Sequence, residues 1–594
     1  MVALHSGLKG KAEDILLRLV AEHPDHADAW LNLANLAVLG KRSDTALERF
    51  QKVLDLSPNQ PEALLWTGVL QSHKGMFGSA ISYLEAADKA KPRDVQTLLP
   101  LAQCRFQLGQ ITGAIEAYTI ALELMPGNPD LLFSRATCML EQLRFKEAQA
   151  DLSSALQRKQ IPMGFALLGE IHQRFGRSSE ALSQAERALR LDPKNTQALS
   201  TAANALAAMG RLDEAEQIWA RAERGAVKPA RLLNAKAKSY LDLGHFDRAR
   251  EILLRSIEID PKFGETYYSY LSCKRTSRED LPILAKLEVQ LACSDVRAQD
   301  REFLLYALGK SQTDLGEFQA SLKSFDEANA LKLKTSGAKQ FDRDRFKAYF
   351  EGQRSIYSAE AIRQMQGDGS KSDVPIFVLG MMRSGTSLME QILSCHPNIG
   401  GAGEQAFWHE HESEWRNSFS SLSCRYLALL ESAAPGFAKI IDKNPANAML
   451  AGLLAIAFPK GKILNMRRHP VDTALSIWMT PMRTTAPFIG TRSDIVFAYQ
   501  QYARLSQHWE EAIPSNQFRA ISYEELVGNP EAVIQDAVEF CGVDWDPVCL
   551  HPENNSRPVL TPSFWQVRQP LYRGSTNRWK QYSPWLGEFE RLMP

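Results

Sequence analysis

The chain has 594 residues, of which 44% are hydrophobic, 9% aromatic and 23% charged, so it is long enough for two or more globular domains and unlike a disordered chain. Its formal net charge is zero, which gives no overall preference for nucleic acid or a membrane surface. Eight cysteines without a C-x-x-C spacing exclude a zinc ribbon and a dense disulfide framework. No apolar run is long enough for a signal peptide or a membrane span, so we expect a soluble, cytoplasmic protein.

An internal repeat organises the first half of the chain. Alanines recur in steps of 34 residues, with a single step of 33, at Ala12, Ala46, Ala80, Ala114, Ala148, Ala181, Ala215 and Ala249. A proline lies 12 residues after six of these alanines, and a glycine about five residues before most of them marks a turn. Each unit is therefore predicted to be helix, turn, helix.

This pattern resembles the tetratricopeptide repeat, in which a small residue lets paired helices pack closely and a proline ends the second helix. The resemblance implies an all-α solenoid over residues 1–335 with a groove for an extended peptide or a partner protein. Only 11 residues precede Ala12, so we expect the solenoid to begin with half a repeat, completed by a missing cap or another chain. The spacing falters between Lys262 and Asp300, and one more hairpin is expected from Phe303 to Leu331.

Beyond a predicted helical connector at residues 336–370, apolar runs alternate with helical segments. This alternation predicts an α/β domain with a parallel sheet over residues 371–594. Four strands are expected, at residues 376–379, 439–441, 463–466 and 518–521. Ligands of such sheets bind beyond the carboxyl ends of the strands, so the residues after each strand are the site candidates.

A glycine loop, Gly380 to Gly385, follows the first strand and precedes a helix that Thr386 and Ser387 are expected to cap. Strand, glycine loop and helix together form an anion site, because backbone N–H groups and the positive end of the helix dipole point to one place. The spacing G-x-x-x-x-G-T-S is that of a P-loop, but Thr386 stands where a Walker loop carries its lysine. This difference argues against an NTPase or a kinase.

The loop sequence Met382-Arg383-Ser384-Gly385-Thr386 resembles the 5′-phosphosulfate loop of sulfotransferases. The chain as a whole resembles bacterial tetratricopeptide-repeat sulfotransferases related to the tyrosylprotein sulfotransferase family. The resemblance implies that 3′-phosphoadenosine 5′-phosphosulfate is the cofactor, that no metal is needed, and that the loop from Arg383 to Ser387 binds the cofactor. It also implies that Glu404, after Gly403, is the catalytic base.

Residues past the other strands complete the implied site. Lys443, after the second strand, matches a lysine that helps the departing phosphate in related sulfotransferases. The stretch from Arg468 to Ser476 resembles the 3′-phosphate motif R-x-P-x-D-x-x-x-S, and a guanidinium with a hydroxyl suits a phosphate monoester. The acid-free stretch near the C-terminus looks like the segment that closes over the nucleotide, and its candidate residues are Ser563, Arg573, Gly574 and Arg578.

The acceptor remains open. A hydroxyl on a protein or peptide bound by the repeats is expected, and tyrosine is one candidate, although Ala406 replaces an arginine of the tyrosylprotein enzymes. A second possible function is a protein-binding scaffold whose sulfotransferase-like domain is inactive or senses nucleotide.

The sequence does not predict a metal site at His409 and His411. These histidines are two residues apart, whereas the H-E-x-x-H zinc motif needs histidines four residues apart. Because the repeats hold none of these site residues, a chain starting near Lys371 is expected to keep its nucleotide site.

Overall fold

The computed structural model describes residues 9–142, 144–335, 341–482, 486–555, 557–559, 561, 563–571, 574 and 576–593. The chain forms two compact units, Met1–Gly164 and Phe165–Pro594. Within the described residues no helix is long and apolar enough to cross a membrane. The cytoplasmic location stays a prediction from the sequence, as do the domain boundaries near residues 335 and 370.

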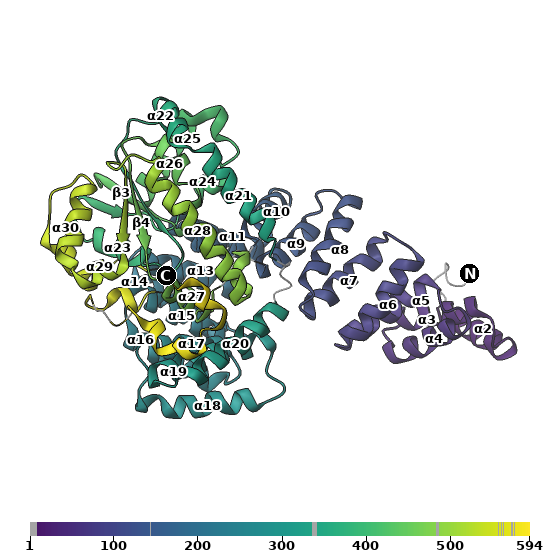
Figure 1. The fold of residues 1–594 in the computed structure, drawn as a ribbon. Coiled ribbons are helices and arrows are strands. Elements are labelled where there is room, and N and C mark those ends of the chain that lie inside the picture. The colour runs from purple at the N-terminus through teal and green to yellow at the C-terminus, as the bar shows by residue number, and fades with distance from the viewer. Residues whose placement is uncertain are drawn as a thin grey trace. The chain divides into compact units, whose positions relative to one another are not determined.

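The first unit consists of paired helices, which Figure 1 shows in purple and blue. They are α2 (Lys9–Glu22), α3 (Ala27–Leu39), α4 (Ser43–Leu56), α5 (Pro61–His73), α6 (Phe77–Ala90), α7 (Val95–Gln107), α8 (Ile111–Leu124), α9 (Pro129–Glu141) and α10 (Phe145–Arg158). The periodic alanines Ala46, Ala80, Ala114 and Ala148 are completely buried, because a methyl group is all that the close approach of two helices allows. The predicted helix, turn, helix repeat is confirmed. Ala12 lies in α2, as expected for a second helix.

The repeats continue into the second unit. Their helices are α11 (Pro162–Arg174), α12 (Ser178–Leu191), α13 (Thr196–Ala208), α14 (Leu212–Gly225), α15 (Pro229–Leu243), α16 (Phe246–Ile259), α17 (Gly264–Ser272), α18 (Leu281–Ala292), α19 (Ala298–Leu315) and α20 (Phe318–Thr335). The hairpin expected from Phe303 to Leu331 is confirmed as α19 and α20. The repeat spacing falters at α17 and α18, which are shorter helices joined by a longer connection.

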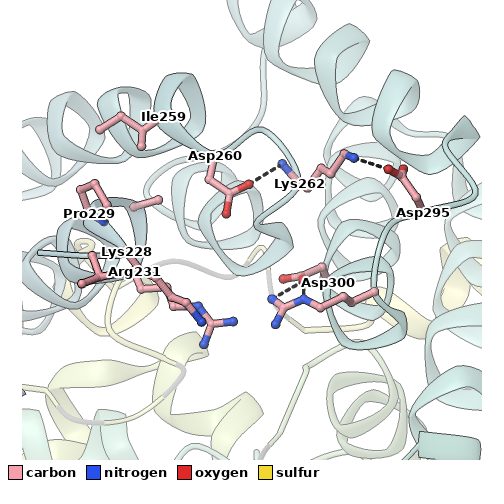
Figure 2. Close-up of a pocket in the computed structure, with 11 residues that line it drawn as sticks. Lys228, Pro229, Arg231, Ile259, Asp260, Lys262, Asp295 and Asp300 are labelled. Atoms are coloured by element: carbon pink, nitrogen blue, oxygen red, sulfur yellow. Dashed lines mark hydrogen bonds and ion pairs between the residues drawn. The ribbon is translucent and has the colours of Figure 1, made fainter. Parts of the chain in front are cut away.

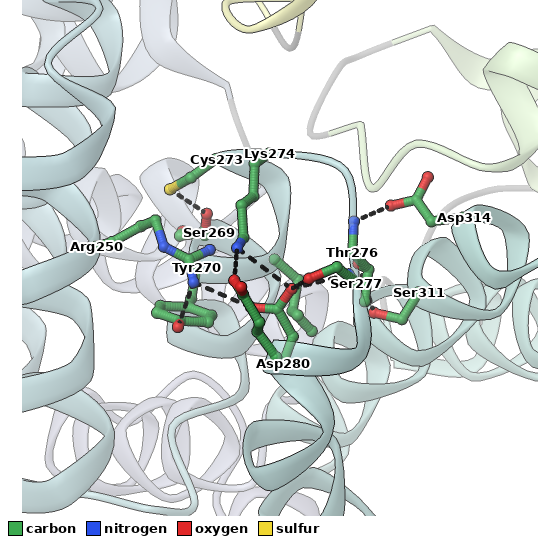
Figure 3. A network of polar contacts seen from close by, with 12 residues as sticks. Arg250, Ser269, Tyr270, Cys273, Lys274, Thr276, Ser277, Asp280, Ser311 and Asp314 are labelled. Carbon is green, nitrogen blue, oxygen red and sulfur yellow. Dashed lines mark hydrogen bonds and ion pairs between the residues drawn. The ribbon is translucent and has the colours of Figure 1, made fainter.

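A polar network holds the irregular repeat together (Figure 3). Arg250 of α16 donates through Nη2 to the hydroxyl of Tyr270 in α17 at 2.5 Å and to Oδ1 of Asp280 at 2.9 Å. The backbone N–H of Thr276 donates to Oδ2 of Asp314 in α19 at 2.8 Å. Charge-assisted bonds of this kind are stronger than neutral ones. They therefore fix α17 against α16 and α19 where the regular repeat packing is interrupted.

The α/β part contains a five-stranded parallel sheet in the order β2-β3-β1-β4-β5. Its strands are β1 (Pro375–Gly380), β2 (Ile399–Gly401), β3 (Lys439–Lys443), β4 (Lys462–Arg467) and β5 (Phe518–Ser522). The four predicted strands and the parallel arrangement are confirmed, and β2 is an additional edge strand. Lys443 lies opposite Val378 and Met466 lies opposite Gly380, so the residues after β1, β3 and β4 meet at one edge of the sheet.

Helices cover both faces of this sheet (Figure 1). The helices of this part are α21 (Arg343–Ile356), α22 (Ala359–Met365), α23 (Thr386–Leu393), α24 (Phe407–Glu410), α25 (Trp415–Ala433), α26 (Ala451–Ala457), α27 (Pro470–Trp478), α28 (Arg492–Ala512), α29 (Tyr523–Gly528) and α30 (Pro530–Phe540). Short 3-10 helices are η1 (Arg278–Asp280), η2 (Gln366–Asp368), η3 (Pro445–Met449), η4 (Pro487–Gly490), η5 (Pro547–Leu550), η6 (Pro552–Asn554), η7 (Gln566–Arg568), η9 (Arg578–Trp585) and η10 (Gly587–Leu592).

The last repeats and the sheet share one hydrophobic core. Ile376 and Val378 of β1 face a cluster formed with α23, α29 and α30. Phe377 and Leu379, which alternate with them, face the other side. That second cluster also contains buried side chains of the last repeat hairpin, namely Leu305, Tyr306, Leu322, Phe325 and Ala328. The α/β part therefore depends on α19 and α20 for part of its core.

This shared core changes the expectation for a shortened chain. Starting at Lys371 removes four large buried side chains of the hairpin together with Phe350, Tyr357 and Ile362 of the same cluster. Each contributes roughly 1.5–3 kcal/mol, so their sum is at least comparable with the ~5–15 kcal/mol stability of a typical domain. We predict that a chain starting at Lys371 fails to unfold cooperatively, whereas one starting at Pro162 does so near the full-length Tm. Thermal unfolding followed by circular dichroism measures both. An equal Tm for the two shortened chains would contradict a shared core.

Candidate functional site

The glycine loop turns directly from β1 into α23. Gly385 is the N-cap residue, with a φ of +105°, and a Cβ there would lie 2.6 Å from Cδ2 of Tyr523. Only glycine fits this left-handed and crowded position. The expected capping by Thr386 and Ser387 is wrong, because both lie inside the helix and no side chain caps it. The first N–H groups of α23 are therefore left for an anion rather than for a cap.

Arg383 joins the loop to two distant segments. Its backbone adopts a φ of +68°, a costly conformation for a residue with a side chain. Nε donates to the hydroxyl of Ser476 in α27 at 3.0 Å, and Nη1 donates to the hydroxyl of Ser563 at 2.7 Å. Three residues that the sequence placed in separate motifs are thus in direct contact.

Further positive charge surrounds this arginine. Arg468 donates from Nη1 to the carbonyl of Arg383 at 3.2 Å, and its guanidinium lies 4.8 Å from the ring centre of Tyr523. Burial, together with the like charges of Arg468 and Arg578, lowers the pKa of Arg383 to about 10. An arginine does not lose its proton in a protein, so Arg383 stays charged beside Arg468 and Arg578, and an anion would offset both its lost hydration and these like charges.

Two hydroxyls of the loop differ in their contacts. The hydroxyl of Ser384 is buried and has no hydrogen-bond partner among the described residues. The hydroxyl of Ser387 shares a hydrogen bond of 3.2 Å with that of Thr561. A buried hydroxyl without a partner costs stability unless a ligand satisfies it. Ser384 therefore fits a bound anion, as does the positive charge beside it.

Glu404 and Lys443 form an ion pair at the carboxyl end of β3. The Lys443 side chain is 1% exposed, while that of Glu404 is 51% exposed. Lys443 also donates its backbone N–H to the carbonyl of Gly403 at 2.9 Å. The buried ammonium thus directs a carboxylate that is open to solvent, which is the arrangement a base needs to reach a hydroxyl from outside.

A buried carboxyl group lies behind this pair. Asp442 accepts hydrogen bonds from the hydroxyl of Tyr426 (2.7 Å), the backbone N–H of Gln405 (3.2 Å) and the amide of Asn447 (3.1 Å). Burial raises the pKa of Asp442 to about 7, although these three bonds favour the ionised form. The side chain of Asn444 donates to the carbonyl of Gln405 at 2.8 Å, so the backbone after Glu404 is held on both sides.

Two of the four candidate residues of the C-terminal segment lie near Arg383. Ser563 contacts Arg383, and Arg578 contributes to the electrostatic environment of Arg383. Gly574 is exposed, and Arg573 lies outside the described residues. Trp579 stacks on His469 with ring centres 5.2 Å apart and donates its backbone N–H to Asp472 at 2.7 Å, which joins the segment to the start of α27.

Sequence reasoning missed a second ion pair beside the site. Arg557 contacts Oε1 of Glu390 in α23 at 2.7 Å, and the same oxygen accepts the backbone N–H of Gly403 at 3.2 Å. Glu390 is almost completely buried and does not belong to any of the sequence motifs described above. The available sequence signal was the stretch around Arg557 that contains no Asp or Glu, because its basic side chains can form ion pairs only with acidic residues from other parts of the chain.

Two other places in the molecule do not resemble this site. A cavity of about 470 Å³ lies in the solenoid (Figure 2), where ion pairs Lys262–Asp295 and Arg297–Asp300 neutralise much of the charge of its lining. None of the predicted site residues lines it. His411 contacts the carbonyl of Phe407 and the side chain of Arg425, and no metal-binding group of three side chains occurs among the described residues.

Comparisons with known proteins find two families in different parts of the chain. Residues 375–432 and 408–547 match the sulfotransferase family, and residues 2–61, 174–239 and 230–263 match the tetratricopeptide repeat. Residues 41–121 match subunit 3 of the anaphase-promoting complex, or cyclosome.

The relatives include a protein that matches most of the chain and proteins that match about a third of it. An uncharacterised protein of Aquifex aeolicus is 24% identical over 92% of this chain and 71% of its own length. Protein-tyrosine sulfotransferase A of Caenorhabditis elegans is 25% identical over 34% of this chain, and the Drosophila melanogaster protein-tyrosine sulfotransferase is 23% identical over 34%. The chain spans 59% and 46% of those two relatives. The crystal structure of YrrB, titled a tetratricopeptide repeat protein with an unusual peptide-binding site, is 20% identical with a TM-score of 0.30 and covers 31% of this chain and 95% of its own.

The buried Asp442 generates a prediction about pH. Its pKa in the folded protein is about 7 and that of an unfolded aspartate is about 3.9, so the folded state holds the proton more tightly. The associated stability is present below about pH 4 and is lost as the pH rises through about 7. The Tm of Asp442→Asn relative to wild type is therefore expected to be higher at about pH 8 than at about pH 5. A pH-independent difference between the two Tm values would show that Asp442 does not titrate in this range.

Proposed function

The chain joins tetratricopeptide repeats to a domain of the sulfotransferase family, and from this we propose that it transfers a sulfuryl group from 3′-phosphoadenosine 5′-phosphosulfate to an acceptor hydroxyl. The single observation that carries the proposal is the positive cluster at the glycine loop. Arg383 is held there by neutral hydroxyls and lies near Arg468 and Arg578. Such a cluster fits a ligand with several negative charges better than it fits a neutral one.

We assign the ligand's parts to residues by their chemistry. The N–H groups at the start of α23, with Arg383 and Ser384, are proposed to hold the phosphate that carries the sulfuryl group. Arg468 and Ser476 are proposed to hold the 3′-phosphate, since a guanidinium fork and a hydroxyl suit a phosphate monoester. The donor supplies an activated sulfuryl group when it is bound. Thr386, Ser387, Ser563, Arg573, Gly574 and Arg578 are proposed to complete the nucleotide site.

The transfer needs a base for the acceptor hydroxyl, and we assign that role to Glu404. Its carboxylate is half exposed, and its ion pair with Lys443 restricts the directions in which it can point. Glu404 would take the proton from the acceptor as the acceptor oxygen bonds to sulfur and the bond between sulfur and the 5′-phosphate oxygen breaks, so that 3′-phosphoadenosine 5′-phosphate would leave. The ammonium of Lys443 would then remain beside the reacting groups as a fixed positive charge.

The acceptor is proposed to be a protein or peptide bound by the repeats. Tetratricopeptide repeats indicate protein or peptide binding, and two relatives are named protein-tyrosine sulfotransferases. Binding to the repeats would raise the local concentration of an acceptor side chain into the mM range. Tyrosine is one candidate, although Ala406 lacks the charge that would attract an acidic peptide.

The 3′-phosphate assignment is tested by nucleotide affinity. Arg468→Ala is expected to weaken 3′-phosphoadenosine 5′-phosphate binding at least about tenfold, because a charge-assisted contact contributes roughly 1.5–3 kcal/mol, and to leave 5′-AMP binding unchanged. Arg467→Ala is the matched control, since Arg467 pairs with Glu510 and contacts Ser506 instead. Isothermal titration calorimetry measures both. Equal affinity of the wild type for the two nucleotides would refute the assignment.

The base is tested by Glu404→Gln, which keeps an oxygen for Lys443 and removes the ability to take a proton. Sulfuryl transfer is expected to fall on the order of 10²–10⁴-fold with nucleotide affinity unchanged. Glu414→Gln is the control, and transfer in EDTA is expected to equal that without it. Mass spectrometry of candidate acceptors incubated with labelled donor measures the product. Unchanged transfer would place the base elsewhere, and a wild type that binds nucleotide without transfer would favour a nucleotide-sensing scaffold.

A further inference from the structure

The loop that carries Glu404 is held from outside by Arg557. Oε1 of Glu390 accepts both the Arg557 guanidinium (2.7 Å) and the backbone N–H of Gly403 (3.2 Å). The Arg557 guanidinium also lies against the backbone of Gly401, where a Cβ atom would be only 2.6 Å from Cζ of Arg557. Glu390 is almost completely buried, so removing Arg557 would leave a buried charge without its partner. The conformation of the residues just before Glu404 therefore depends on Arg557.

Arg557 is in turn connected to the repeats. Nη2 of Arg568 donates to the carbonyl of Arg557 and to the carbonyl of Asp242 in α15, both at 2.8 Å. The same Asp242 carbonyl accepts the backbone N–H of Val559 at 2.9 Å. One carbonyl at the end of a repeat helix thus anchors two points of the C-terminal segment.

The turn after α15 is shaped to receive this segment. Gly244 ends α15 with a φ of +86°, and a Cβ there would lie 2.6 Å from Nε of Arg568. Phe246, which begins α16, packs on Phe564 with ring centres 6.3 Å apart. The anchored segment also contains Ser563, the hydroxyl that contacts Arg383. In Figure 1 the yellow C-terminal segment accordingly passes by α15 and α16.

We infer that Arg557 and Arg568 are positioning residues for the Glu404 loop and that the turn between α15 and α16 holds them in place. The connection runs from the Asp242 carbonyl through Arg568 to the carbonyl of Arg557, and from the Arg557 side chain through Glu390 to the N–H of Gly403. The inference rests on the proposed role of Glu404. It makes the repeats a structural part of the reaction site, in addition to a surface for an acceptor.

Two glycines allow a matched test in the full-length protein. Gly244 and Gly316 both end a repeat helix with a φ of +86°, so alanine imposes the same backbone strain at either position. Only Gly244 has Arg568 against it, whereas a Cβ on Gly316 meets nothing within 4 Å. Gly244→Ala must therefore displace Arg568, and Gly316→Ala is its control.

The readout is amide hydrogen exchange, measured by mass spectrometry on peptides that cover Asn398–Ala406, with Lys462–Arg467 of β4 as the internal reference. Gly244→Ala and Arg568→Ala are expected to speed exchange in the loop peptide at least about tenfold and to leave exchange in the reference peptide unchanged. The reason is that the hydrogen bond from the Gly403 N–H to the charged Glu390 is loosened. Gly316→Ala is expected to keep the wild-type rate in both. Where transfer is measured, Gly244→Ala should lower kcat about tenfold or more, whereas Gly316→Ala should keep the wild-type kcat.

The inference is overturned if Gly244→Ala and Gly316→Ala change loop exchange equally, or if Arg568→Ala leaves it at the wild-type rate. Arg568→Ala carries no backbone strain, so it decides the question if Gly244→Ala does not fold. Failure of the proposed function has a different signature: the wild type would not bind 3′-phosphoadenosine 5′-phosphate. In that case the exchange rates still test whether the repeats position this loop.

Discussion

The site depends on how one charged group, Arg383, is kept out of water. Its hydrogen-bond partners among the described residues are two neutral hydroxyls, one from α27 and one from the C-terminal segment. A guanidinium remains charged under these conditions, so the fold retains a positive potential that an anion can relieve. The left-handed backbone of Arg383 and the start of α23, which no side chain caps, belong to the same short loop as this charge.

The secondary structure followed from local patterns where burial is strong. Strands β1, β3, β4 and β5 have apolar side chains on both faces, and the repeat helices have a small residue at a fixed spacing, so both could be predicted. Strand β2 could not, because Ile399-Gly400-Gly401 offers one apolar side chain and is a strand only through its pairing with β3. The start of α23 was misjudged because Gly385, and not a hydroxyl side chain, satisfies the geometry of the turn.

Residues of the candidate site could be predicted only where they lie together in one contiguous sequence motif. The loop at Arg383 and the stretch from Arg468 to Ser476 are contiguous in sequence, and the structure brings both to the same edge of the sheet. The pair of Glu390 and Arg557 joins residues far apart in the chain, and neither has a local signal. The contact of Arg568 with Asp242 is more distant still, since it links a repeat to the end of the chain. Contacts of this kind depend on tertiary packing that residue spacing does not encode.

The two units differ in how freely they can change during evolution. In a solenoid each repeat contacts mainly its neighbours, so whole 34-residue units among α2 to α10 can be duplicated or lost with little effect elsewhere. The later repeats lack this freedom, because Thr313 of α19 contacts the hydroxyl of Tyr582 and Asn329 of α20 donates to the carbonyl of Trp478. An insertion there would shift every contact beyond it. Variation in repeat number among homologues should therefore fall on the amino-terminal side of these contacts, where it would lengthen the solenoid without shifting them.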